Sequence, residues 1–155
     1  NAFTDLNKAV MECNGKVTPE FKRLIGYVTS FSSGCLYCQA HTILGAERFG
    51  CTKKRLEEVW NYANSSAFSN AEKSALDFAF ASASVPNKVT EKEASQLKNY
   101  WSDNDIVEIM GVIALFGFLN RWNDSMGSAL EDLPIEKGEE HLMENTNWTP
   151  GKHRV

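Results

Sequence analysis

Residues 18–50 read TPEFKRLIGYVTSFSSGCLYCQAHTILGAERFG, and this stretch decides the fold class. A threonine that can cap a helix precedes a proline suited to the first helical position, and apolar residues then recur at helical spacing. We predict a helix that begins after Thr18 and ends near Gly34, and a second from Cys35 to Phe49 with Gly50 as its left-handed stop. The pattern therefore favours an all-α protein.

Capping signals divide the following part of the chain into further helices. Thr52 precedes a third helical pattern, and either Ser69 or Asn70 precedes a fourth. Thr90 with Glu93 three residues later forms a capping box for a fifth. No alternating strand pattern and no fixed-period repeat interrupts the series, so we expect a helical bundle.

A sixth helix is expected at about residues 103–130, and it is apolar on nearly every side between 106 and 119. A helix of that kind suits the centre of a bundle, surrounded by the others. After Pro134 the sequence becomes polar and irregular. We therefore predict one helical domain of about six helices at residues 1–133, and an extended C-terminal arm at residues 134–155 that docks on another surface.

The composition is that of an ordinary folded domain. The 155 residues are 43% hydrophobic and 23% charged, and they fit a single domain. Sixteen Lys and Arg against 20 Asp and Glu leave a formal charge of −4 without a dense basic run, so no nucleic-acid partner is expected. The longest apolar stretch, 109–119, is shorter than the roughly 20 residues of a membrane-spanning helix, and no signal-peptide pattern opens the sequence. We expect a cytoplasmic protein without a membrane partner.

The residues most suited to chemistry are Cys35 and Cys38, which follow a glycine where the second helix begins. Residues three apart share a face of a helix, so the two thiols can meet, and a helix N-terminus stabilises a thiolate. His41 follows Cys38 by three residues and could take the thiol proton. Attack on a peroxide gives a sulfenic acid, which the second cysteine can trap as a disulfide. The catalytic candidates are therefore Cys38, Cys35 and His41.

Other interpretations of the cysteine pair stay open. A structural zinc site takes four ligands, and the remaining candidates Cys13, Cys51, His141 and His153 show no second paired spacing. Covalent haem attachment needs a histidine directly after the second cysteine, where this chain has Gln39. The plainest alternative is two buried thiols that pack as small hydrophobic groups. We expect no metal, no cofactor, and no catalytic role for Cys13 or Cys51.

The run at residues 33–42 resembles the thiol motif of the carboxymuconolactone decarboxylase and alkylhydroperoxidase D superfamily. Residues 116–124 and 148–152 resemble two other segments of that family. The resemblance implies an alkylhydroperoxidase D-like helical fold and a homo-oligomer with the active site near subunit contacts. It further implies that Cys38 attacks the peroxide, that Cys35 resolves the intermediate, and that a dithiol or lipoyl-type partner supplies the electrons.

Two positions depart from the family pattern. The family's relay glutamate stands twelve residues before the first cysteine, where this chain has Arg23, and its relay histidine stands four after the second, where this chain has Thr42. We expect Arg23 to face solvent. Members that decarboxylate a lactone generally lack the cysteine pair, so the pair favours a thiol-dependent hydroperoxide reductase with His41 as proton shuttle. The alternatives are a non-enzymatic thiol–disulfide sensor or assembly module, and a lactone decarboxylase-type lyase.

Overall fold

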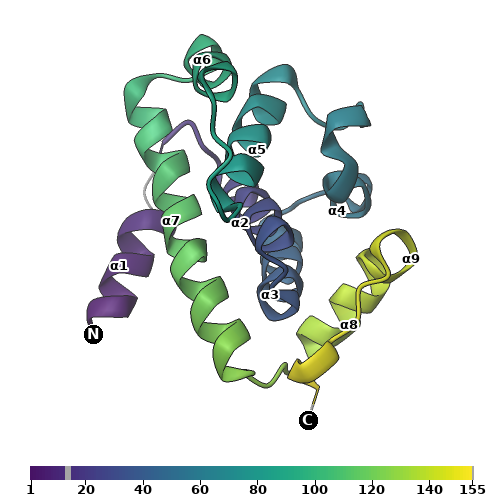
Figure 1. Ribbon diagram of the computed structural model, residues 1–155. Coiled ribbons are helices and arrows are strands. Elements are labelled where there is room, and N and C mark those ends of the chain that lie inside the picture. The colour runs from purple at the N-terminus through teal and green to yellow at the C-terminus, as the bar shows by residue number, and fades with distance from the viewer. Residues whose placement is uncertain (13–14, 155) are drawn as a thin grey trace.

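The computed structural model describes residues 1–12 and 15–154. Its helices are α1 (Ala2–Met11), α2 (Pro19–Ser33), α3 (Leu36–Arg48), α4 (Lys53–Glu58), the 3₁₀ helix η1 (Val59–Asn64), α5 (Asn70–Ala83), α6 (Glu91–Tyr100), α7 (Asp103–Met126), α8 (Asp132–His141), α9 (Met143–Thr146) and the 3₁₀ helix η2 (Gly151–His153) (Figure 1). The described residues contain no strand, which confirms the all-α prediction.

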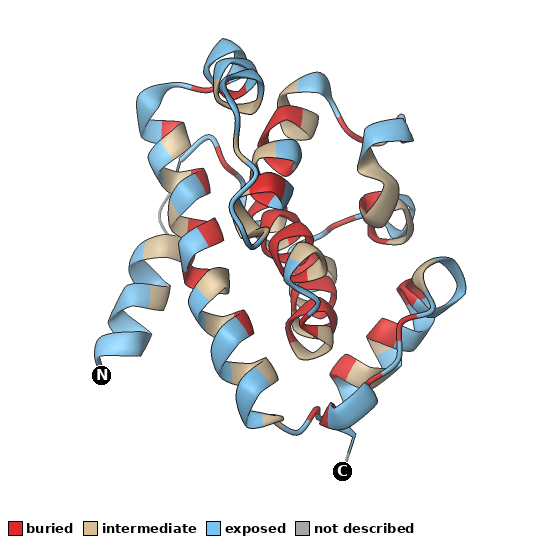
Figure 2. Cartoon of the chain, viewed as in Figure 1, coloured by how far each residue is buried: buried red, intermediate tan, exposed pale blue. Residues whose placement is uncertain are grey.

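Helices α2 and α3 form the buried centre of the molecule (Figure 2). The hydroxyl of Thr18 accepts the backbone N–H of Phe21 at 3.2 Å and caps α2, as the sequence predicts. Gly34 ends α2 with a φ of 76°, in the left-handed region that glycine tolerates best. The chain then enters α3 directly, and α2 packs along α3, α5 and α7. This arrangement places the start of α3 inside the bundle.

The predicted helix starts are confirmed by their caps. Thr90 and Glu93 form a capping box at α6, and Ser69 rather than Asn70 caps α5. Each cap is a contact between residues two or three apart, so it depends little on tertiary structure. Sequence alone therefore locates these helix starts well.

Helix α7 differs from the central helix that the sequence predicts. Ile109 and Val112 are fully buried, but Val107 is 71% exposed and Trp122 is 58% exposed. One side of α7 is buried against the bundle and the other is exposed (Figure 2). Several residues on the exposed side are apolar. The sequence pattern shows that residues on every side of this helix are apolar. It does not show which of these sides are covered by other helices of the same chain.

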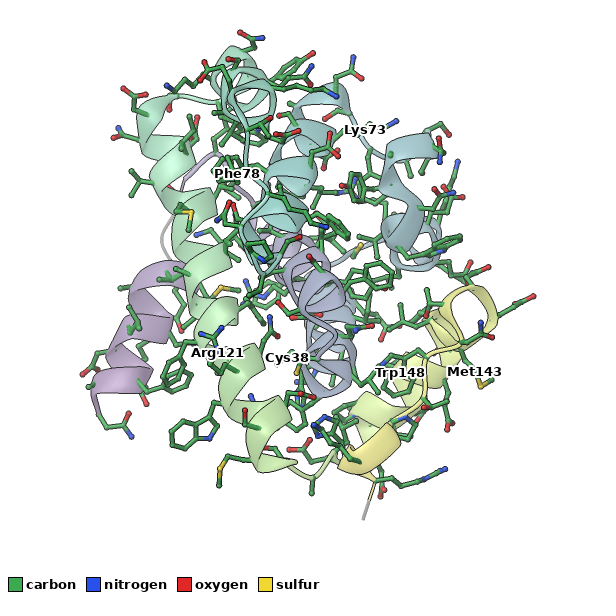
Figure 3. The ribbon with its side chains drawn as sticks, in the orientation of Figure 1. Cys38, Lys73, Phe78, Arg121, Met143 and Trp148 are labelled. Carbon is green, nitrogen blue, oxygen red and sulfur yellow. The ribbon has the colours of Figure 1, made fainter. Side chains whose placement is uncertain are left out.

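The expectation of an extended arm is wrong for residues 132–146, which form α8 and α9. Pro134 lies in the first turn of α8, where a proline costs no intrahelical hydrogen bond. After α9 the chain folds back, and Trp148 lies buried between α8 and α3 (Figure 3). The boundary at residue 133 stays a prediction. No helix of the described residues is long and apolar enough to cross a membrane.

Arg55 joins three helices through charge. Its guanidinium binds Glu20 of α2 at 2.8 Å and Glu72 of α5 at 2.7 Å. We expect Arg55→Met to lower the free energy of unfolding by about 1 to 3 kcal/mol, because two half-buried carboxylates would lose their shared partner. Chemical denaturation at pH 7 measures this loss, and the exposed Lys53→Met is the control.

The same variant tests a pH dependence. Burial acts to raise the pKa of Glu72, but the hydrogen bonds from Arg55 outweigh it, so the pKa lies below the ordinary value of 4.5. The folded state therefore gains stability from this carboxylate above pH 4.5 and loses it as the pH falls through the lower folded pKa. The stability difference between wild type and Arg55→Met should narrow below that pH. A difference that stays constant from neutral to acid pH would contradict this account.

Candidate active site

The cysteine pair lies where α3 begins, between α3 and α7 (Figure 3). Cys35 is the N-cap of α3, and its Sγ accepts the backbone N–H of Cys38 at 3.4 Å. The exposed fractions of Cys35 and Cys38 are 0% and 2%. The turn that follows Gly34 thus brings the two thiols together, as the spacing predicts.

The pKa values of the two thiols shift in opposite directions. The pKa of Cys35 is lowered, first by a hydrogen bond from the Cys38 thiol and also by backbone N–H groups, against the opposing effect of burial. The pKa of Cys38 is raised, because its proton is held by the Cys35 sulfur and because it is buried. Of the two thiols, Cys35 therefore loses its proton more readily.

Asn123 of α7 contacts the pair from the opposite side. Its Nδ2 lies 3.8 Å from the Sγ of Cys38 and donates to the carbonyl of Leu119 at 3.0 Å. Its Oδ1 accepts the Ser128 hydroxyl at 2.8 Å, which fixes the orientation of the amide. The sequence analysis did not place Asn123 in the site. The only signal for it was its position in the family-like segment 116–124.

His41, the predicted proton shuttle, turns toward the outer end of the site. Its ring lies 4.4 Å from that of Tyr37, and its Nε2 lies 3.0 Å from the carboxylate of Glu131. Burial lowers the pKa of His41, and the charge of Glu131 opposes that shift only in part. Among the described residues, His41 forms no hydrogen bond with either thiol. The structure brings it beside Tyr37, between the cysteines in sequence, without direct contact to sulfur.

A second histidine lies on the other side of Tyr37. His153 of η2 is buried, and its ring centroid is 5.6 Å from that of Tyr37. Its Nδ1 lies 2.8 Å from the carbonyl of Ser128, and its Nε2 lies 3.6 Å from Asp124. From the sequence, His153 was a candidate only as a zinc ligand, since it lies 115 positions after Cys38 and no local pattern joins the two residues.

Arg23 and Thr42, the positions that depart from the family pattern, do not contribute side chains to the thiol site. Arg23 is half-buried, with its guanidinium 4.0 Å from the ring centroid of Phe49, so the expectation that it faces solvent is wrong. Thr42 donates its hydroxyl to the carbonyl of Cys38 at 2.8 Å, within its own helix. Neither side chain supplies the missing acid or base at the thiols.

One group of described residues has the geometry to hold a metal ion. Ligand atoms of Glu47, Glu140 and His141 lie within 4.8 Å of one another. The ammonium of Lys137 already lies 3.2 Å from Glu47 and 2.7 Å from Glu140, so a cation would have to displace it. We interpret the group as an ion-pair network between α3 and α8.

The remaining cysteines lie apart from the pair. Cys51 is buried, and burial together with the nearby Glu20 raises its pKa to about 12. Cys13 lies outside the described residues.

An apolar pocket of about 360 Å³ lies beside the site. It is formed between α1 and α7, and its lining residues are Phe3, Phe118, Leu119, Trp122 and Asn123. Asn123 is the polar member of this lining and also the residue that contacts Cys38. The pocket suits a small apolar or aromatic molecule.

The sequence profile of the carboxymuconolactone decarboxylase family matches residues 1–81, more than half of the chain. The chain belongs to the carboxymuconolactone decarboxylase family. This match covers the cysteine pair and both helices around it, which confirms the resemblance inferred from the motif. No curated protein is similar enough to the chain to count as a match.

Solved structures extend the family relationship over most of the fold. The apo crystal structure of the debrominase Bmp8 matches with a TM-score of 0.85 and 32% identity, over 90% of this chain and 74% of that one. A cysteine-to-alanine variant of Bmp8 in complex with 2,3,4-tribromopyrrole matches with a TM-score of 0.86 and 31% identity, over the same shares. An uncharacterized peroxidase-related protein from Ralstonia eutropha JMP134, with the alkylhydroperoxidase AhpD core, matches with a TM-score of 0.76 and 24% identity, over 86% of this chain and 70% of that one. This last likeness confirms the predicted AhpD-like fold.

Proposed function

We propose that this family member is a thiol-dependent hydroperoxide reductase. The observation that carries the proposal is the contact of Cys35 Sγ with the Cys38 N–H at the start of α3. Two thiols held this close can give up two electrons and become a disulfide. The balance is one hydroperoxide and two thiols in, and one alcohol, one water and one disulfide out.

In the proposed cycle Cys38 attacks the distal oxygen of the hydroperoxide. The O–O bond breaks, the alkoxide leaves with the proton that the Cys38 thiol gives up, and Cys38 becomes a sulfenic acid. Cys35 then attacks the Cys38 sulfur, the S–O bond breaks, and the hydroxide leaves as water with the proton that the Cys35 thiol gives up. An external dithiol or lipoyl-type reductant returns the pair to the reduced state. The lowered pKa of Cys35 supports its role in the second step.

The reaction requires access to sulfur, and both cysteines are covered in the described conformation. Asn123 lies against Cys38 and also lines the apolar pocket. We propose the pocket as the route of a small hydroperoxide.

The test is steady-state consumption of cumene hydroperoxide by purified protein with dithiothreitol or dihydrolipoamide as donor. The proposal predicts turnover that is proportional to protein concentration and that depends on the donor. A protein that forms the Cys35–Cys38 disulfide but shows no turnover would instead be a thiol–disulfide sensor or assembly module. Measuring its molecular size under oxidising and reducing conditions would then show whether the disulfide changes the oligomeric state.

His41 is proposed as the proton shuttle of this cycle. Its lowered pKa keeps the imidazole neutral near pH 7, so it can accept a proton. We expect His41→Asn to reduce peroxide turnover on the order of a hundredfold at pH 7 while the fold is kept. The matched control is Glu131→Gln, which removes the charge facing His41 and should have a smaller effect. Unchanged turnover in His41→Asn would remove the residue from the cycle.

A second candidate function is the removal of a halogen from a small aromatic ring. It is favoured by the similarity to the debrominase Bmp8, at 32% identity over 90% of the chain. The same two thiols would exchange an aryl bromide for an aryl hydrogen, with one bromide, one proton and one disulfide as the other products. Bromide release from 2,3,4-tribromopyrrole in the presence of a dithiol tests this function. A rate of bromide release above the rate of hydroperoxide consumption would favour it over peroxide reduction.

We also propose that the protein is a homo-oligomer. The side chains exposed along α7 support this, since monomeric proteins rarely leave such an apolar surface uncovered. They are Val107, Met110, Phe118, Trp122 and Met126. Light scattering after size-exclusion chromatography measures the subunit number. A monomer at micromolar concentration would contradict the proposal.

A further inference from the structure

The segment that follows α9 is fixed against the thiol site. The Trp148 indole N–H donates to the carbonyl of Leu36, in the first turn of α3, at 3.2 Å. The backbone N–H of Leu130 donates to the carbonyl of His153 at 2.8 Å. Residues 148–154 have no role in the proposed cycle, and only 148–152 belong to the segment that resembles the family. These contacts hold the side chain of His153 in a defined place.

Both nitrogens of the His153 ring face acceptors. A backbone carbonyl can only accept, so Nδ1 donates to Ser128 across 2.8 Å. Nε2 is buried without a hydrogen bond and lies 3.6 Å from an Asp124 carboxylate oxygen. A proton on Nε2 would therefore point at the Asp124 carboxylate. The ring of Tyr37 at 5.6 Å adds a favourable surface for a cation.

Asp124 is the group that joins His153 to the cysteines. It directly follows Asn123, whose amide contacts the Cys38 sulfur. Its negative charge acts to raise the pKa of both thiols, against thiolate formation. Two basic side chains of one segment face that carboxylate, namely Lys152 with its Nζ at 3.1 Å and His153 with its Nε2 at 3.6 Å.

We propose that His153 is a positioning residue that activates the Cys35–Cys38 pair by neutralising the charge of Asp124. The side chain of His153 is fully buried, so its charge is screened less by solvent than that of the half-exposed Lys152. The other charged and titratable groups around it are Tyr37 of α3 and Arg154, which pairs with Glu139 of α8 at 3.9 Å. The proposal rests on the proposed function for its biological meaning, but not for its test.

The experiment measures the ultraviolet absorbance of thiolate as a function of pH in the reduced full-length protein. The signal of the same variant with both Cys35→Ser and Cys38→Ser is subtracted, which removes the other cysteines. We expect His153→Gln to raise the titration midpoint of the pair by about half to one pH unit, which leaves roughly three- to tenfold less thiolate at neutral pH. The matched control is His141→Gln, which changes a buried histidine of the α3–α8 network and should leave the midpoint unchanged.

A second variant separates electrostatics from packing. If His153 acts through Asp124, then Asp124→Asn added to His153→Gln returns the midpoint to the wild-type value or below it. Loosened packing of residues 148–154 would not be repaired by that change. A His153→Gln midpoint equal to that of wild type, or a double variant as high as His153→Gln alone, would overturn the proposal.

This measurement uses neither peroxide nor reductant. A wild-type protein without peroxide turnover would therefore contradict the proposed function and leave the titration to decide the role of His153. An active wild type with an unchanged His153→Gln midpoint would contradict the inference alone.

Discussion

The Cys38→Ser protein is expected to consume hydroperoxide no faster than buffer, a loss of more than about a thousandfold. A serine hydroxyl keeps the shape of the side chain but cannot form the sulfenic acid on which the cycle depends. Cys35→Ser is expected to react once and stop, with Cys38 left as a sulfenic acid that a dimedone label detects. Cys51→Ser is the matched control, because that thiol is buried outside the pair, and it should keep wild-type turnover.

The opposite result for the two serine variants would exchange the roles of Cys35 and Cys38. The pKa of Cys35 is the lowered one of the pair, because this residue caps α3 and its sulfur accepts hydrogen bonds from Cys38. If Cys35→Ser abolishes the reaction and Cys38→Ser leaves a labelled Cys35, then Cys35 is the nucleophile. The order of the two steps carried over from the family resemblance would then be reversed in this chain.

Trp148→Ala is expected to lower the free energy of unfolding by about 3 to 5 kcal/mol. The indole is only 1% exposed, and its N–H donates to the carbonyl of Leu36. Chemical denaturation followed by circular dichroism measures the loss. The control is Tyr100→Ala, since that ring is 43% exposed, lies outside the apolar surface of α7, and its removal should cost less than about 1 kcal/mol.

A change at the opposite side of the indole should act in the same direction. A Cβ at position 138 would lie 2.5 Å from the Trp148 ring, so Gly138→Ala is expected to displace the indole from its place against α8. The hydrogen bond to Leu36 limits how far the ring can move. Equal losses for Trp148→Ala and Tyr100→Ala would contradict the packing of residues 148–154 on α3.

Local signals in the sequence predict much of this fold. The caps at Thr18, Ser69 and Thr90 are contacts between near neighbours, and the structure contains each of them. The irregular composition after Pro134 misled the prediction, because a proline in the first turn does not oppose a helix. Helix α1 was not predicted, and it packs on α7 with an apolar surface that is largely exposed. Such elements depend on tertiary packing rather than on their own pattern.

The sequence also predicts only part of the candidate site. The meeting of Cys35 and Cys38 follows from their spacing on one helix. The positions of Asn123, Asp124 and His153 do not, because α7 and η2 reach the thiols only through the packing of the whole chain. His41 lies near the site as predicted from spacing, yet its contacts run to Tyr37 and Glu131. The spacing predicts that His41 lies one turn of helix away from Cys38. Only the tertiary structure shows that its imidazole contacts Tyr37 and Glu131 rather than a thiol.

The most direct test of the central claim is a single turnover. Fully reduced protein receives one equivalent of cumene hydroperoxide without added donor, and mass spectrometry then examines the peptide of residues 24–48, which contains both cysteines of the pair. The account predicts one alcohol per protein and a peptide lighter by two hydrogen atoms, with an intact link between Cys35 and Cys38. Unchanged thiols after exposure to excess hydroperoxide would contradict the claim that this pair reduces peroxides.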